Sequence, residues 1–234
     1  TWSFLMQLIH SYSTGRIEFD FFSSVMHFFE SYFVRRSFEG KEATGIDKVF
    51  KPLFDQININ NPKLEDIVNF VNQFNTQRFI SDEVFKALIK NNDIYRSRLC
   101  KFILMRYENS TRSRDELTQD DYDLANIDHI LPQNPASGSD WNQPHLFTAE
   151  QQKSYRDTWA NLIPLTKKLN SLKSNRNFTD FKSIINEDEG YYQRYKTSTE
   201  LMQKDRWDNK QLLKRAEKLC MSALRIWNID TESN

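Results

Sequence analysis

The sequence predicts a mainly α-helical protein, in which a helical bundle subdomain precedes a small strand–strand–helix subdomain with flanking helices. Two observations predict the helical class: the 234 residues include only 5 Gly and 6 Pro, and apolar residues recur at three- and four-residue spacing. A third predicts two strands. The short apolar run 124–131 stops at Pro132, and Pro164 allows the run 161–166 only an edge position.

The helical bundle subdomain is expected over residues 1–115. Within 17–34, Phe22, Val25 and Phe29 share one face, which is typical of an amphipathic helix with an aromatic stripe in the core. Further helices are expected at 44–55, 66–74, 84–89 and 94–107. The polar, charged segment 108–123 then indicates a domain boundary.

The second subdomain is expected over residues 116–234. After the strand at 124–131, residues 132–158 are predicted to be a long irregular loop with a short helix near 148–157. The second strand, 161–166, leads into a helix that begins near Lys167. Apolar spacing predicts two more helices, at 178–185 and 208–227.

Cysteine content and hydropathy exclude several classes of protein. Cys100 and Cys220 are far apart and form no CxxC pair, so neither a zinc ribbon nor a disulfide framework is expected. No apolar run approaches the roughly 20 residues that cross a bilayer, so we expect no membrane partner. Two free thiols fit a reducing cytoplasm.

The chain begins with Thr and enters a helical pattern at once, so we expect a segment of a longer protein.

The net charge is zero, but the charges are distributed unevenly. Residues 1–150 hold 16 Lys and Arg against 21 Asp and Glu, whereas residues 151–229 hold 16 against 9. A basic C-terminal third fits a phosphate-rich partner on one side of the protein. It fits a solvated helical surface equally well.

The segment 126-NIDHILPQNP-135 brings an Asp-His pair to the end of the first strand. Strand, loop, strand and helix in this order outline a ββα-metal nuclease finger. Phosphodiester hydrolysis needs a base that works near neutral pH, as imidazole does, and a hard cation that prefers carboxylate and amide oxygens. His129 is therefore the candidate base, with Asp128 and Asn170 as candidate ligands of Mg²⁺, for which Mn²⁺ would substitute. Taken alone, the Asp-His pair also fits a hydrogen-bonded structural pair.

Asn161, at the start of the second strand, is the remaining candidate for the catalytic set with His129 and Asn170. Its amide can donate and accept hydrogen bonds, so it would fix the loop or orient the histidine through a backbone carbonyl. Basic residues surround the following helix, and we expect them to bind the phosphates of DNA: Lys167, Lys168, Lys173, Arg176 and Lys182. For Lys182 a salt bridge is the alternative.

Several pieces of the sequence resemble the C-terminal nuclease domain of GmrSD-type modification-dependent restriction enzymes, a branch of the HNH (His-Me finger) nucleases. The matching pieces are IDHILPQNP (127–135), Trp141, WANLIPLTKKLNSLKSN (159–175), FTDFK (178–182), Trp207 and Arg215. The resemblance implies a Mg²⁺-dependent DNA endonuclease or nickase that acts on phage duplex DNA in bacterial defence. It also implies a separate N-terminal sensor or NTPase domain of the same protein that controls cutting. These residues themselves contain no Walker-type Gly-rich loop.

The sequence departs from the family pattern at three places. Ala160 replaces the usual Gly, Ile163-Pro164 replaces the usual Leu-Thr, and the third HNH position is Asn170, not His. The alternative is a catalytically degenerate helical module that binds DNA or a partner. The joint presence of His129, its neighbour Asp128 and both asparagines favours catalysis. The same chemistry would also cleave RNA.

Overall fold

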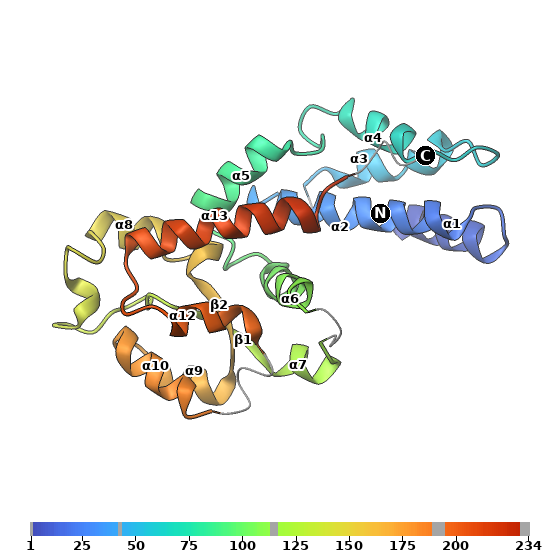
Figure 1. The fold of residues 1–234 in the computed structure, drawn as a ribbon. Coiled ribbons are helices and arrows are strands. Elements are labelled where there is room, and N and C mark those ends of the chain that lie inside the picture. Colours follow the sequence, from blue (N-terminus) through green and yellow to red (C-terminus); the bar gives the residue numbers. More distant parts are fainter. Residues whose placement is uncertain (1, 42–43, 113–116, 189–194, 230–234) are drawn as a thin grey trace. The chain divides into compact units, whose positions relative to one another are not determined.

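The computed structural model describes residues 2–41, 44–112, 117–188 and 195–229, which are mainly helical as predicted (Figure 1). The chain divides into two compact units: Thr1–Phe85 with Trp227–Asn234, and Lys86–Ile226. This division differs from the expected boundary between residues 115 and 116. No described helix is both long and apolar enough to cross a membrane.

The first unit is built from helices around an aromatic core. Its elements are α1 (Trp2–Ser13), α2 (Phe19–Phe38), α3 (Ile46–Phe50), η1 (Leu53–Gln56), α4 (Leu64–Asn72) and the start of α5 (Asp82–Asn91). The ring of Phe29 on α2 contacts Phe4 and Phe50, with centroids 5.1 and 4.8 Å apart. The aromatic stripe predicted for 17–34 therefore lies in this core.

Two arginines are buried near the end of α2. Arg35 donates to the carbonyl oxygens of Ile80 and Trp227, and Arg36 donates to that of Thr76. Burial of a charged group is tolerated when most of its donors are satisfied in this way. Of the nitrogen atoms of these two guanidinium groups, only Nε of Arg36 has no hydrogen-bond partner among the described residues. These side chains therefore hold the chain segments of the first unit together.

The second unit contains the only sheet among the described residues. Its elements are α6 (Cys100–Ser110), α7 (Gln119–Leu124), β1 (Ala125–His129), η2 (Asp140–Asn142), α8 (Ala149–Tyr155), η3 (Trp159–Asn161), β2 (Leu162–Thr166), α9 (Lys167–Lys173), α10 (Phe178–Asn186), η4 (Lys196–Ser198), α12 (Thr199–Met202) and α13 (Asn209–Ile226). Helices α6 and α9 both contact β1 and β2.

β1 and β2 form an antiparallel pair in which His129 lies opposite Leu162. Both strands of a two-stranded sheet are edge strands, so Pro164 is accommodated within β2. β2 leads directly into α9, where the hydroxyl of Thr166 caps the helix by accepting from the amide of Leu169. Two antiparallel strands and a helix thus follow one another in the predicted order.

One predicted helix begins later in the structure than expected. The helix expected at 94–107 begins only at Cys100. The carboxylate of Asp93 accepts from the amide of Tyr95 at 2.8 Å, a local bond that competes with helix formation.

The start of the polar segment 108–123 is packed into the second unit and is not an exposed linker. Glu108 is fully buried and accepts hydrogen bonds from Lys196 and Thr197, within the second unit. Part of the segment, residues 113–116, lies outside the described residues.

Candidate functional site

The site is assembled where the two strands of the second unit meet the loop between them. His129 is the last residue of β1 and is 5% exposed. Beyond the strand, the amide of Ile130 donates to the carbonyl of Asn161 at 2.8 Å. The antiparallel register of β1 and β2 therefore brings residues that follow β1 next to residues that precede β2.

The buried side chain of Asn161 closes this junction. Its Oδ1 accepts from the amide of Leu131 at 2.8 Å, and its Nδ2 donates to the carbonyls of Leu131 and Arg156 at 3.0 and 2.8 Å. One amide thus binds the chain on both sides of the loop, as its two donors and its acceptor allow.

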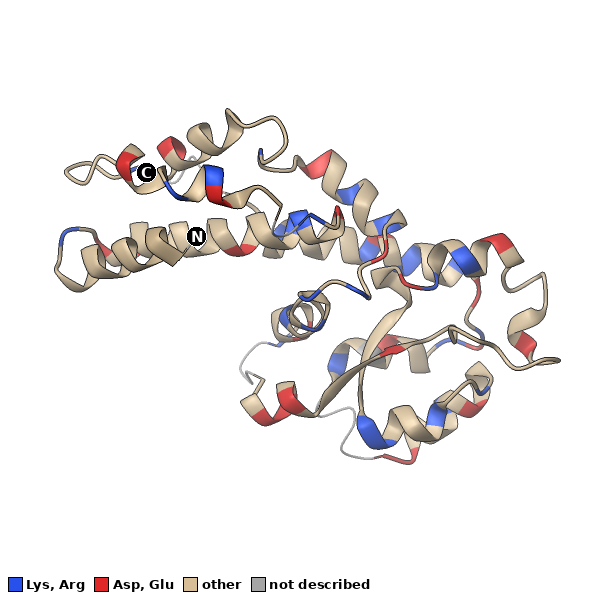
Figure 2. Cartoon of the chain, turned by 180° about the vertical axis from the view of Figure 1, so that it is seen from behind, with Lys and Arg blue, Asp and Glu red and all other residues tan. Residues whose placement is uncertain are grey.

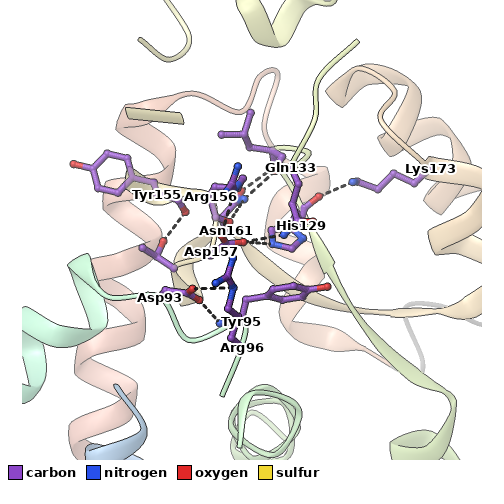
Figure 3. A network of polar contacts seen from close by, with 12 residues as sticks. Asp93, Tyr95, Arg96, His129, Gln133, Tyr155, Arg156, Asp157, Asn161 and Lys173 are labelled. Carbon is purple, nitrogen blue, oxygen red and sulfur yellow. Dashed lines mark hydrogen bonds and ion pairs between the residues drawn. The ribbon is translucent and has the colours of Figure 1, made fainter. Parts of the chain in front are cut away.

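His129 is held by a carboxylate from the end of that loop. Its Nε2 lies 2.8 Å from Oδ1 of Asp157 (Figure 3). Two further side chains fix this carboxylate: Nε2 of Gln133 donates to Oδ1 at 3.0 Å, and Nε of Arg156 donates to Oδ2 at 3.2 Å. The Asp157 carboxylate, itself held by Gln133 and Arg156, thereby sets the orientation of the imidazole.

The charges of this pair follow from its environment. Burial lowers the pKa of His129 below its ordinary value, against the opposing effect of Asp157, so the imidazole is neutral near pH 7. Burial acts to raise the pKa of Asp157, but hydrogen bonds from Gln133, His129 and Arg156 outweigh it and lower the pKa overall. Because an ionised carboxylate only accepts, we assign the ring proton to Nε2, which leaves Nδ1 with its lone pair.

The loop that precedes α6 also reaches the site. The amides of Ile94 and Tyr95 both donate to the backbone carbonyl of Asp157, at 3.1 and 3.3 Å. The ring of Tyr95 packs against that of His129, with centroids 4.4 Å apart and planes at 62°. Arg96 beside it is mainly exposed, with its nearest described carboxylate, Asp93, at 3.9 Å.

On β1, Asp128 is paired with a lysine. Its Oδ2 lies 2.9 Å from Nζ of Lys173, and the same ammonium donates to the carbonyl of His129 at 2.5 Å. Lys173 is 1% exposed. Burial lowers its pKa, and Asp128 opposes that shift. The ammonium expected to contact phosphate is therefore directed into the protein, toward β1.

The other predicted residues lie on or after α9. Asn170 is half-buried, one helical turn before Lys173. Lys167, Lys168 and Arg176 are exposed, and Figure 2 shows basic positions at the start of the helix that follows β2. Lys182 is half-buried, and its ammonium donates to the carbonyl of Lys204 at 2.6 Å.

The oxygen donors near β1 are suited to a hard cation. Asp128 offers a carboxylate and Asn170 an amide oxygen, from a strand and a helix that contact each other. Among the residues that the structure describes, no group of three or more His, Cys, Asp and Glu is placed to hold a metal ion. Mg²⁺ keeps several waters and is commonly held by one or two protein oxygens, and a carboxylate and an amide oxygen are of the chemical type it takes.

Sequence reasoning missed Asp157 and Tyr95. A signal for Asp157 was present, because it lies four residues before Asn161, at the end of the loop that the hairpin brings back to His129. No local signal pointed to Tyr95, which comes from a segment expected to be helical.

More than half of the chain is similar to a known family. Residues 79–221 match the family model described as GmrSD restriction endonucleases, C-terminal domain. The match covers the whole site described above. No curated protein matches the chain.

Proposed function

The chain belongs to the GmrSD restriction endonuclease C-terminal domain family, and on that premise we propose that its second unit hydrolyses phosphodiester bonds of DNA. The observation that carries this proposal is His129, buried at the end of β1 with its ring oriented by Asp157. The role we propose is that of the cutting part of a cytoplasmic bacterial restriction protein directed against phage DNA. A sensor or NTPase domain of the same protein would control cutting.

We propose that His129 is the general base. Its Nδ1 takes the proton of the attacking water while Nε2–H remains bonded to Asp157. The carboxylate then stabilises the positive charge that forms on the ring. Asp157 acts through the histidine and is therefore a positioning residue.

In this proposal Asp128 and Asn170 hold one Mg²⁺, or Mn²⁺ in its place. The bound ion supplies positive charge that stabilises the phosphate oxygens in the transition state. Asn161 keeps the end of β1 in place through its three hydrogen bonds to Leu131 and Arg156.

The exposed cations on and just after α9 are proposed to bind the DNA backbone. Lys167 and Lys168 begin α9, and Arg176 follows that helix. Contacts to phosphate set the position of the duplex and carry no sequence information. Recognition of a DNA modification would then fall to the controlling domain.

The test is a plasmid-nicking assay with the full chain and Mg²⁺ or Mn²⁺. We expect relaxed or linear product from the parent protein and none from His129→Ala. The matched control is His145→Ala, which removes an exposed histidine of the same unit and should cut like the parent. Circular dichroism of each variant checks that the fold is intact.

Equal cutting by the parent and a folded His129→Ala variant would refute the assignment of the base. DNA binding without cutting in any divalent metal would instead support a binding module. A parallel assay with an RNA substrate of the same length as the DNA tests whether the protein cuts DNA or RNA.

A further inference from the structure

A buried lysine occupies the side of the site where the proposed cation binds. Lys173 is the last residue of α9 and is 1% exposed, although lysine is almost never fully buried unless its charge is paired. Its ammonium lies 2.9 Å from Oδ2 of Asp128, donates to the carbonyl of His129 and lies 5.4 Å from the centre of the Phe181 ring. Each of these partners favours a positive charge.

The carboxylate of Asp128 is therefore already compensated within the protein. Its side chain is 12% exposed, so little solvent screens the pair. A divalent ion that binds Asp128 must share the carboxylate with this ammonium or displace it. Either route sets like charges against each other at short range, which costs binding energy.

We propose that Lys173 is a built-in counter-ion of Asp128 that lowers the affinity of the site for divalent cations until DNA is bound. This inference rests on the proposed function, because it takes Asp128 as a cation ligand. A phosphate of the DNA adds negative charge and oxygen ligands, which together offset the ammonium. By linkage, DNA then raises the affinity for the cation, and the cation raises the affinity for DNA by the same factor.

The first experiment measures Mn²⁺ binding to the full chain without DNA, by electron paramagnetic resonance of free Mn²⁺. Lys173→Met removes the charge and keeps a long apolar stem against Phe181. We expect this variant to bind Mn²⁺ at least about tenfold more tightly than the parent, since a nearby like charge is removed. The matched control is Lys153→Met on α8, which removes an exposed lysine and should leave the affinity unchanged.

Equal affinities of parent and Lys173→Met, within twofold, would overturn the proposal, and so would weaker binding by a folded Lys173→Met variant. Lys173→Gln, which is polar and uncharged, is the second variant if the methionine substitution prevents folding. Thermal unfolding monitors the fold. The same titration on Asp128→Asn should show no binding at this site.

The second experiment needs no substitution of Lys173. Mn²⁺ affinity is measured on His129→Ala with and without a short duplex, so that the DNA stays intact. We expect the duplex to raise the affinity at least about tenfold, and an unchanged affinity would refute the coupling. If the parent nicks plasmid while the Lys173 variants bind Mn²⁺ no better, only this inference fails. If affinities change as expected but no metal supports nicking, the proposed function fails.

Discussion

The Nε2 atom of His129 and the Oδ1 atom of Asp157 lie 2.8 Å apart, although 28 residues separate them in the chain. The histidine is fixed by the strand it ends. The aspartate is fixed at its side chain by Gln133 and Arg156 and at its carbonyl by the amide of Tyr95. The ring is thus oriented before any substrate arrives, as is required of a general base that takes a proton from one defined position.

Replacement of Asp157 by Asn should lower the nicking rate roughly 100-fold, because the ring loses its charged acceptor and its fixed tautomer. Asp157 also raises the pKa of His129 against the effect of burial. Its removal should therefore move the acid limb of the pH–rate profile to lower pH. The measurement is single-turnover nicking from pH 5 to 8.

Asp180→Asn is the matched control for this experiment, because Asp180 is an exposed aspartate of the same unit. It should cut DNA with the parent's rate and pH profile. A lower rate for Asp157→Asn with an unmoved acid limb would point to a structural role alone.

Stability should fall as the pH drops below about 6.5, the ordinary pKa of histidine. Burial lowers the pKa of His129 in the folded state, so between that pKa and 6.5 the unfolded chain binds more protons. The stabilisation is present above this window and is lost as the pH falls through it. The pKa of Asp157 is lowered as well, but its contribution is lost only at far more acid pH.

Urea unfolding at pH 5.5 and 7.5 tests this expectation. His129→Gln removes the titrating ring, so the variant should lose less stability between the two pH values than the parent loses. The same loss in both proteins would contradict the prediction.

Asn161→Ala should destabilise the second unit by about 2–4 kcal/mol. Three hydrogen bonds are lost, and buried groups of Leu131 are left unpaired. Asn142→Ala is the control, since this exposed amide makes one bond, to the carbonyl of Ala136, and should cost under about 1 kcal/mol. Equal unfolding midpoints for the two variants in urea would contradict this role of Asn161.

Neutralisation of Lys167 and Lys168 together should weaken DNA binding and lower its salt dependence. If each lysine neutralises one phosphate, the slope of log K against log salt should fall in magnitude by about 1.8. Fluorescence anisotropy with a labelled duplex at several salt concentrations gives this slope. Lys153→Gln is the control, and an unchanged slope for the double variant would remove these lysines from the interface.

The two free thiols should resist alkylation in the folded protein. Both cysteines are buried, and burial raises the pKa of Cys100 to about 12 and that of Cys220 to about 11. The reactive thiolate is therefore scarce near pH 8. Iodoacetamide should modify neither thiol in buffer and both in urea, as read by intact-mass spectrometry. Rapid labelling in buffer would contradict the burial.

The sequence predicted the elements that depend on local pattern. The first strand, predicted over 124–131 and observed over Ala125–His129, follows from apolar spacing and from Pro132, and the helix predicted to begin near Lys167 begins there. The pairs that complete the site were not predictable in this way. Asp157 and Lys173 meet β1 from 28 and 44 residues away, and no local periodicity encodes such contacts. Lys173 resembled a surface residue because lysine usually is one.

The three hydrogen bonds of Asn161 close the base of the segment between the strands. Bonds from Asn175 to the carbonyl of Asn134 and from the amide of Asp140 to Asn177 anchor it on both sides of Gly138. The chain is already closed at its base, and Gly138 at the tip is exposed, with φ +79° and open space around it. Doubling the length of a flexible loop costs only about 0.6 kcal/mol. This tip is therefore a place where a tag or a foreign peptide can be inserted, and where relatives can diverge, without disturbing the histidine.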